Sequence, residues 1–315
     1  MTEYVNPLSD FLRNASDEEK KEVFDQVMDE ACEMQKNWLD ESFPVDFFRK
    51  KHESGKSPLR YPGGKTRARE LLCSYFPDDM TEMVSVFLGG GSFELYMAAR
   101  GVLVWGYDAW DDLVDFWNYA LHHPKQLADM ADESCPLPKN DYYVLRTLHE
   151  HLKKGTLDRA ASFYSLNRAS FGGCVGGGWS SDHTDGRKKV QKYTKDDIEN
   201  LRNFSSGNLH HVECLPFQES LSLDMHKDHW LYLDPPYVMH TKSAANLYGN
   251  KGELHKNFDH VALAEILHTR DKWVLSYSDK PLVRELYSDC KIDAVSWKWS
   301  MGKLKDGDEL IITPR

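Results

Sequence analysis

The sequence predicts an α/β fold in which helices cover both faces of a mostly parallel sheet that ends in an antiparallel hairpin. Three observations lead to this fold class. Apolar stretches of strand length alternate with helical stretches, a glycine-rich turn at residues 89–91 joins a buried strand to a helix, and the last two strands follow each other across a short polar connection. The 315 residues are compatible with one large domain carrying an insertion, which we favour, or with two modest domains.

The N-terminal part is expected to form an acidic amphipathic helix over residues 16–39. Ser16 and Glu19 match a capping box, and apolar residues recur at helical spacing from Val23 to Trp38. Residues 1–56 are therefore predicted to be an acidic helical extension. Packing on the core is the more common role of such a helix, while formation of a homo-oligomer and binding of a protein partner stay open.

The first strand and helix of the predicted sheet enclose the glycine-rich turn. Residues 83–88 suit a buried strand, Gly89 to Gly91 a tight turn, and residues 92–100 the following helix, while a second strand over residues 102–107 ends at Asp108. Rossmann-like folds hold a nucleoside with this layout, because glycine lets a ligand approach the backbone and the acid accepts hydrogen bonds from the ribose hydroxyls. The spacing does not match the dinucleotide fingerprint, which disfavours NAD.

The remaining elements alternate as a parallel sheet requires. Helical patterns over residues 113–121 and 142–153 precede a glycine-rich basic segment, residues 167–195. Strands are then predicted over residues 209–213, 229–233, 273–277, 294–298 and 310–313, with helices over residues 259–269 and 280–287. The short polar connection before residue 310 makes the last two strands a hairpin.

Composition excludes several classes of protein. No apolar run approaches the roughly 20 residues that span a bilayer, and the first residues lack the layout of a secretory signal, so no membrane partner is expected. The 6 cysteines lie far apart without a Cys-x-x-Cys pair, which argues against a disulfide scaffold and a zinc cluster. None of the 14 histidines shows ligand spacing together with cysteine or glutamate, so no metal is expected.

The charge is unevenly distributed along the chain. The net charge of −11 opposes binding to a polyanion, and residues 1–50 hold 13 acidic and 6 basic residues. Residues 146–195, in contrast, hold 10 basic and 4 acidic residues. Because phosphate contacts need lysine and arginine, this second segment is the part suited to a nucleic acid.

The segment that says most about chemistry is a strand followed by Asp234-Pro235-Pro236-Tyr237. Enzymes that methylate exocyclic amino groups place this tetrapeptide at the carboxyl end of a strand. An adenine amino nitrogen is a poor nucleophile until acceptors, here the Asp234 carboxylate and the Pro235 carbonyl, draw its hydrogens out of the ring plane. Two successive prolines keep the turn rigid and leave carbonyls free, and Tyr237 offers a ring for stacking. A proline turn without function is the alternative interpretation.

Three segments in this order resemble one family. They are Arg60-Tyr61-Pro62-Gly63-Gly64-Lys65, Phe87-Leu88-Gly89-Gly90-Gly91-Ser92-Phe93 and Asp234-Pro235-Pro236-Tyr237. Together they resemble the Dam-type (D12 class, α-group) DNA adenine-N6 methyltransferases, which use S-adenosylmethionine. The resemblance extends to residues 163–168 and 258–263 and covers roughly residues 57–315.

The resemblance implies a Rossmann-like, SAM-dependent methyltransferase sheet in residues 57–135 and 205–315, with a target-recognition lobe inserted at residues 136–204. The catalytic residues would be Asp234, Pro235, Pro236 and Tyr237. The residues expected to bind S-adenosylmethionine are Tyr61, Pro62, Lys65, Phe87, Gly89, Gly91, Asp108, Phe217 and Asp234. For Phe217, a position in the core stays equally open. The reaction would be a single displacement without a metal or a covalent enzyme intermediate.

The expected partner is double-stranded DNA, methylated at a specific site after the target adenine is flipped out of the stack. The residues expected to bind DNA are Asn167, Arg168, Arg187, Lys188, Lys189, Lys192 and Tyr248, with a solvated basic loop as the alternative. Methylation of cytosine N4 or of RNA, and a non-catalytic DNA-binding protein on the same fold, stay as alternative functions. The expected location is the cytoplasm, of a bacterium or of a host cell infected by a virus.

Overall fold

The computed structural model describes residues 55–182, 190–191, 193–238, 258–295 and 309–315. The helix expected at residues 16–39 lies outside these residues. So do five of the residues expected to contact DNA, which are Arg187, Lys188, Lys189, Lys192 and Tyr248.

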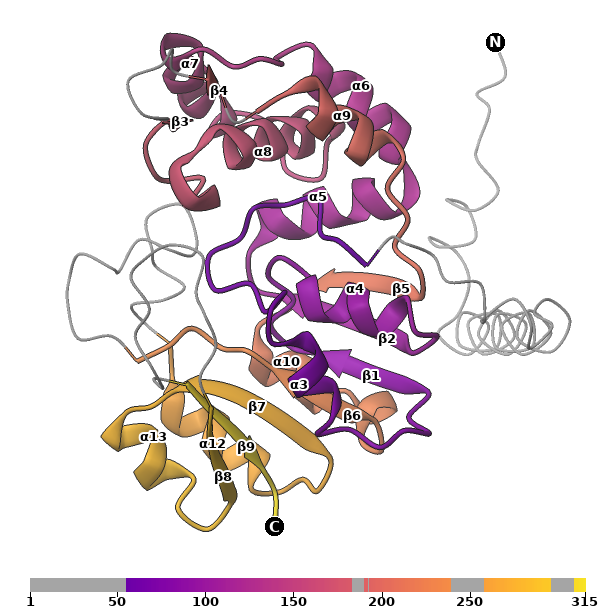
Figure 1. The fold of residues 1–315 in the computed structure, drawn as a ribbon, viewed down its shortest axis with the longest axis vertical. Coiled ribbons are helices and arrows are strands. Elements are labelled where there is room, and N and C mark those ends of the chain that lie inside the picture. The colour runs from indigo at the N-terminus through magenta and orange to yellow at the C-terminus, as the bar shows by residue number, and fades with distance from the viewer. Residues whose placement is uncertain (1–54, 183–189, 192, 239–257, 296–308) are drawn as a thin grey trace, which may run out of the picture. The chain divides into compact units, whose positions relative to one another are not determined.

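A seven-stranded mixed sheet forms the centre of residues 51–315 (Figure 1). The strands lie in the order β5-β2-β1-β6-β7-β9-β8. Their bounds are Glu82–Ser85 (β1), Leu103–Asp108 (β2), Leu209–Cys214 (β5), Trp230–Leu233 (β6), Trp273–Ser278 (β7), Lys291–Val295 (β8) and Glu309–Thr313 (β9). The pairs from β5 to β7 are parallel, whereas β9 lies antiparallel between β7 and β8. The predicted fold class, including the terminal hairpin, is therefore confirmed.

Helices cover both faces of the sheet because its inner strands are apolar on both sides. On β6, Tyr232 packs into one core, while Leu231 and Leu233 pack into the other. The first core contains α3 (Arg69–Cys73), α4 (Ser92–Ala98) and α5 (Asp111–His122). The second contains α10 (Phe217–Ser222), α12 (His260–Leu267) and α13 (Pro281–Leu286).

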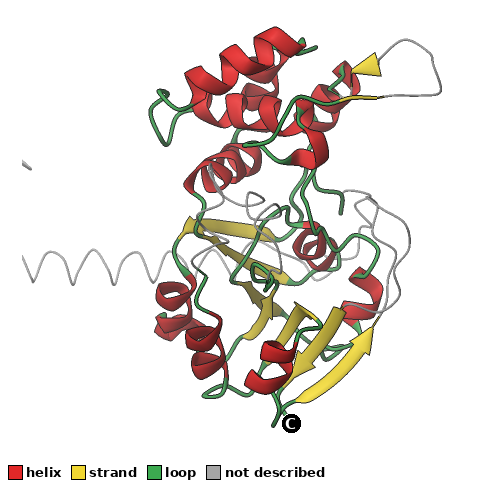
Figure 2. Ribbon diagram, turned by 90° about the vertical axis from the view of Figure 1, so that its left-hand side faces the viewer, coloured by secondary structure: helices red, strands yellow, loops and turns green. Residues whose placement is uncertain are grey.

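A helical lobe adjoins α5, and Figure 2 shows its helices grouped at one end of the sheet. It consists of α6 (Pro124–Asp132), α7 (Lys139–His149), α8 (Leu157–Ala169) and α9 (Lys195–Arg202), with the short strands β3 (Ser181–Asp182) and β4 (Val190–Gln191). The central helix is α8, which contacts α5, α6 and α7. The range expected for the target-recognition lobe, residues 136–204, contains α7 to α9.

A buried ion cluster ties the lobe to α5. Arg159 of α8 pairs with Asp112 of α5, and His149 Nε2 of α7 lies 3.2 Å from the same carboxylate. Burial alone would raise the pKa of Asp112, but hydrogen bonds from His149 and Arg159 outweigh it and lower the pKa to about 2. The carboxylate is thus charged and paired at neutral pH.

Several elements differ from the sequence prediction. The sequence analysis assigns no helix to the glycine-rich basic segment 167–195, whereas Asn167 and Arg168 belong to α8 and a capping box at Thr194 starts α9. Buried helices such as α8 have no amphipathic stripe to detect, because they are covered on most sides. The strand predicted over residues 294–298 begins earlier, at Lys291. The sequence pattern missed this start because β8 is an edge strand with a weak alternation of buried and exposed residues.

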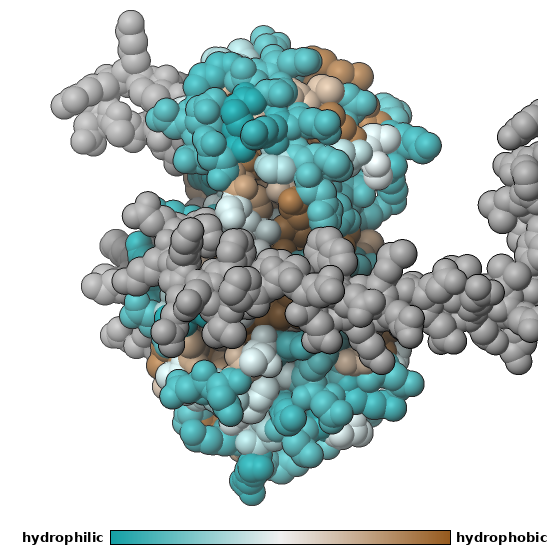
Figure 3. Space-filling model, turned by 90° about the vertical axis from the view of Figure 1, so that its right-hand side faces the viewer, coloured by the Kyte–Doolittle hydropathy of each residue, from teal (hydrophilic) through white to brown (hydrophobic). Residues whose placement is uncertain are grey.

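The view in Figure 3 shows a mainly hydrophilic surface on the helical lobe and on the opposite end of the sheet, with hydrophobic residues gathered between them. Among the described helices, none has the length and apolar character needed to cross a bilayer.

Candidate active site

A cavity of about 410 Å³ opens at the carboxyl ends of β1 and β6. These two strands are parallel neighbours, with β2 on the far side of β1 and β7 on the far side of β6. The chain therefore leaves them in opposite directions, and open α/β sheets bind ligands at such a switch point. The glycine-rich turn and Asp234 both line this cavity, so one space joins the two motifs.

The glycine-rich turn has little free space around its backbone. Gly89 and Gly91 have φ angles of +49° and +62°, which favour glycine. A Cβ on Gly91 would lie 2.9 Å from the Trp117 ring, and one on Gly89 would lie 2.8 Å from the Tyr61 ring. Trp117 Nε1 also donates a hydrogen bond to the Gly89 carbonyl at 2.9 Å. The turn is thus packed from both sides, and Tyr61 and Pro62 line the cavity beside it.

Asp108 lies in the cavity wall at the end of β2. Its carboxylate accepts hydrogen bonds from the backbone N–H groups of Gly89 at 2.9 Å and Trp110 at 3.0 Å. Burial raises the pKa of Asp108 to about 6, although these hydrogen bonds act in the opposite direction. Each oxygen accepts one of these bonds and keeps a lone pair for a hydroxyl group in the cavity.

Three phenylalanines form an apolar part of the cavity wall. Phe217 packs against Phe258 and Phe87 with ring centroids 5.2 and 6.0 Å apart, and the Phe87 and Phe258 centroids are 5.5 Å apart. All three line the cavity. Phe217 thus belongs both to the core, where it is 7% exposed, and to the cavity wall. Such a cluster suits the flat face of a nucleobase.

Lys65 and Asp234 form an ion pair inside the cavity. Lys65 Nζ lies 2.7 Å from Asp234 Oδ1 and 2.6 Å from Oδ2, and it also donates to the Gly63 carbonyl at 3.2 Å. The Lys65 side chain is 3% exposed, which excludes a surface lysine, whereas Asp234 is 23% exposed. Ser276 of β7 donates a further hydrogen bond to Asp234 Oδ1 at 3.2 Å. The carboxylate is thus fixed in place but still open to a ligand.

Tyr237 and Glu309 complete this polar cluster. The Tyr237 hydroxyl lies 3.0 Å from Asp234 Oδ1, accepts a hydrogen bond from Lys65 at 2.9 Å and donates to Glu309 Oε1. One face of its ring packs on Tyr277, with centroids 5.6 Å apart. Of the Asp-Pro-Pro-Tyr turn, Asp234 and Pro236 line the cavity, while Pro235 is buried behind them.

Glu94 is a further acid of the cavity wall, and the sequence prediction does not include it. It lies in the first turn of α4, is 3% exposed and accepts a hydrogen bond from Ser85 Oγ at 2.7 Å. Burial raises the pKa of Glu94 to about 7. An acid directly after the glycine-rich turn was the available signal. Glu309 had no comparable signal, because only strand pairing brings β9 beside β7.

A sequence profile of the D12 class N6 adenine-specific DNA methyltransferases matches residues 61–301, which is more than half of the chain. The chain belongs to this family. A search of curated proteins gave no match. As a D12 class enzyme, the protein transfers a methyl group from S-adenosylmethionine to the N6 amino group of adenine in DNA. Membership favours adenine N6 in DNA over the alternatives of cytosine N4 and RNA.

The residues of this D12 enzyme fit its methyl donor. The cavity offers an aromatic wall for the adenine, the Asp108 carboxylate for the ribose hydroxyls, and ionisable acids for the positively charged sulfonium. Residues of all three features line the same cavity as Asp234.

Two of the residues expected to bind DNA are described, and both are engaged within the protein. Asn167 is 1% exposed. Its Oδ1 accepts a hydrogen bond from the Arg60 backbone N–H at 3.0 Å. Its Nδ2 donates to the backbone carbonyls of Arg60 and Gly173, each at 2.8 Å. Arg168 pairs with Asp197 of α9. These contacts fix the segment that leads to Lys65.

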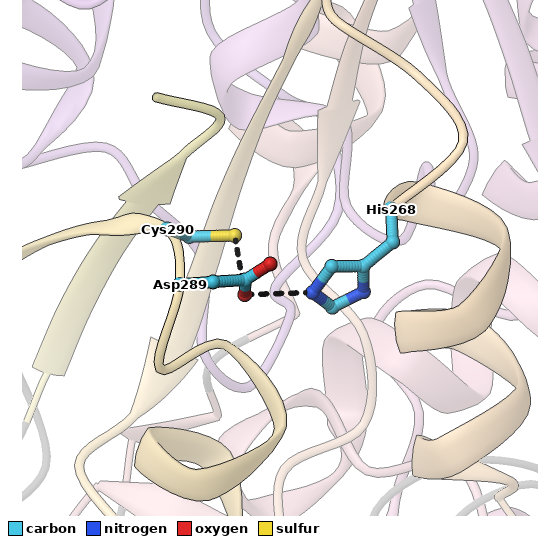
Figure 4. A group of neighbouring side chains, drawn as sticks. All are labelled: His268, Asp289 and Cys290. Carbon is cyan, nitrogen blue, oxygen red and sulfur yellow. Dashed lines mark hydrogen bonds and ion pairs between the residues drawn. The ribbon is translucent and has the colours of Figure 1, made fainter.

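One group among the described residues has the spacing of metal ligands. His268, Asp289 and Cys290 lie together outside the cavity (Figure 4). His268 Nε2 lies 2.9 Å from Asp289 Oδ1, and Cys290 Sγ donates to the same oxygen at 3.7 Å. These contacts pair the three groups with one another, and the absence of a functional metal stays a prediction.

Proposed function

We propose that the cavity is the active site and that Asp234 receives the amino group of an adenine extruded from double-stranded DNA. The single observation that supports this role is the position of Asp234, which is partly exposed in the same cavity as the glycine-rich turn. S-adenosylmethionine supplies an electrophilic methyl group when it is bound. Asp234 then accepts an amino hydrogen, which restores the lone pair of N6 for attack.

Lys65 holds the Asp234 carboxylate in its orientation in this proposal. Both carboxylate oxygens are within 2.7 Å of its ammonium group, and charge-assisted hydrogen bonds of this length are strong in a buried site. Ser276 donates a further hydrogen bond to Oδ1, and the Tyr237 hydroxyl lies 3.0 Å from the same oxygen. The carboxylate is therefore held in place before a substrate enters, which lowers the cost of reorganisation in the transition state.

The proposed binding of the methyl donor divides the cavity into three parts. Phe87 and Phe217 face its adenine, and the Asp108 carboxylate accepts hydrogen bonds from its ribose hydroxyls. Gly89 and Gly91 let the rest of the molecule approach the backbone. Tyr61 and Pro62 support the turn rather than recognise a particular group.

Recognition of a specific DNA site is proposed for the helical lobe, which the chain inserts between β2 and β5. In this proposal, Asn167 and Arg168 orient the lobe and its approach to the cavity instead of reading bases, because their side chains are held by Arg60, Gly173 and Asp197.

The test compares Asp234→Asn with Asp279→Asn. Asp279 directly follows β7 at the same edge of the sheet but pairs with Arg284 outside the cavity lining. With labelled S-adenosylmethionine and unmethylated duplex DNA, D234N should lose at least about a hundredfold in rate, and D279N should match the wild type. Binding of S-adenosylhomocysteine should persist in both variants. A D234N enzyme with nearly normal turnover would refute the role of Asp234.

A further inference from the structure

Glu309 enters the active site from the last strand. It is the first residue of β9, and its register partner on β7 is Ser278, the last residue of that strand. Because β9 runs antiparallel to β7, its beginning lies at the same edge of the sheet as the carboxyl ends of β6 and β7. Glu309 is only 3% exposed there. A buried carboxylate thus lies at the same edge of the sheet as Asp234, which is partly exposed and lines the cavity.

The Tyr237 hydroxyl bridges the two carboxylates. It is 3.0 Å from Asp234 Oδ1 and hydrogen-bonded to Glu309 Oε1, while Lys65 Nζ lies 2.9 Å from the same hydroxyl oxygen and 3.5 Å from Glu309. A phenol has one hydrogen to donate and an oxygen that accepts. Asp234, Tyr237 and Glu309 therefore form a continuous chain along which a proton can move by two short steps.

The electrostatics of the cluster suit Glu309 as the end of this chain. Burial raises the pKa of Glu309 to about 7, with Lys65 acting against the shift and the charge of Asp234 adding to it. Burial holds the pKa of Tyr237 far above its usual range, so the phenol can pass a proton on but does not lose one. The buried phenol of Tyr232 also faces the cluster, and its pKa is raised by burial and by both carboxylates.

We propose that Glu309 is a positioning residue that receives, through Tyr237, the proton that Asp234 takes from the adenine amino group. This inference rests on the proposed role of Asp234. The N6 lone pair forms the new N–C bond, the C–S bond breaks with its electron pair on sulfur, and one N6 hydrogen leaves as a proton to Asp234. The proton of Asp234 then moves to the Tyr237 oxygen as the phenol hydrogen moves to Glu309.

The charges balance along this route. Before the reaction, ionised Asp234 and Glu309 face one lysine, so the cluster carries one excess negative charge opposite the positive sulfonium. Afterwards, Glu309 is neutral, Asp234 is again a carboxylate paired with Lys65, and the sulfur is uncharged. The relay therefore leaves no unpaired charge in the buried cluster, where such a charge would be costly.

The first test is the pH profile of the single-turnover methylation rate. In the wild type the rate should fall as pH decreases below about 7, because a protonated Glu309 cannot accept another proton. Glu309→Gln and Tyr237→Phe should each lower the rate at pH 8 by roughly tenfold to a hundredfold and abolish this inflection. Asp115→Asn is the control, since Asp115 of α5 is an acid with a pKa raised by burial outside the cavity lining and its replacement should leave the inflection in place.

A second readout does not depend on turnover. An acid whose pKa rises from 4.5 to about 7 on folding removes stability as pH increases through this window, and glutamine does not. The stability of E309Q relative to the wild type should therefore increase between these pH values. A flat difference, or an E309Q profile that is merely lower but keeps its inflection, refutes the relay. If one of these results is found and D234N is inactive, the relay is refuted but the proposed role of Asp234 stands. An active D234N would refute the role of Asp234 itself.

Discussion

Lys65 and Asp234 lie 169 residues apart in the sequence, and their charged groups are 2.6 Å apart in the folded protein. Lys65 also approaches Glu309 to 3.5 Å. One buried ammonium group thus compensates two carboxylates, and the pair joins the segment before α3 to the ends of β6 and β9. Replacing the lysine should affect both chemistry and stability.

Lys65→Met should reduce the methylation rate by at least about a hundredfold, because Asp234 loses the donor that holds it. It should also lower the free energy of unfolding, more at pH 8 than at pH 6, since Glu309 with a pKa of about 7 becomes neutral toward the lower pH. Chemical denaturation at the two pH values measures this effect. The control is Lys195→Met, whose exposed pair with Asp132 should contribute less than about 1 kcal/mol. Equal losses at both pH values would contradict the explanation.

Asp108→Asn should weaken binding of S-adenosylhomocysteine by about tenfold or more, because an amide has one oxygen to accept hydrogen bonds where the carboxylate has two. Isothermal titration calorimetry measures the dissociation constant. Asp111→Asn serves as the control, since Asp111 pairs with Lys154 on the surface and does not line the cavity. Unchanged binding by D108N would exclude Asp108 from ligand contact.

Gly91→Ala and Gly155→Ala separate backbone strain from steric overlap. Both glycines have positive φ, +62° and +73°, but a Cβ on Gly91 would lie 2.9 Å from Trp117, whereas nothing lies within 4 Å of one on Gly155. Both variants should lose about 1 to 2 kcal/mol of stability from strain, and G91A should lose a further 1 to 3 kcal/mol, roughly, from overpacking. Equal losses in thermal or chemical unfolding would mean that the Trp117 ring moves away freely.

The affinity for S-adenosylmethionine should fall as pH decreases through about 7, while that for S-adenosylhomocysteine should change much less. The reason is that the pKa values of Glu94 and Glu309 both lie at about 7, and protonation removes the negative charges that attract a sulfonium. Titrations of both ligands at pH 6 and pH 8 measure the difference. Parallel pH dependences for the two ligands would show that neither acid acts on the sulfonium charge.

Local patterns predicted the elements at the edge of the sheet well. The turn at Gly89 comes after β1, Asp108 is the last residue of β2 and the turn at Asp234 directly follows β6, and parallel strands bring their carboxyl ends to one edge. The helices of the lobe were harder to predict, because α8 is buried on most sides and has no polar face that would reveal the helical repeat in the sequence. The position of Glu309 in the active site could not be predicted from local patterns, because it depends on β9 lying between β7 and β8 in the sheet.

That order of strands also has a consequence for synthesis of the protein. Tyr237 leaves the ribosome 72 residues before Glu309, the acid that closes the hydrogen-bonded cluster around it. During this interval the nascent chain can present the Asp234 turn and the glycine-rich turn but not the finished charge arrangement. Active-site assembly therefore has to wait until β9 has been synthesised, and a nascent chain that ends before β9 lacks one of the two carboxylates that share Lys65.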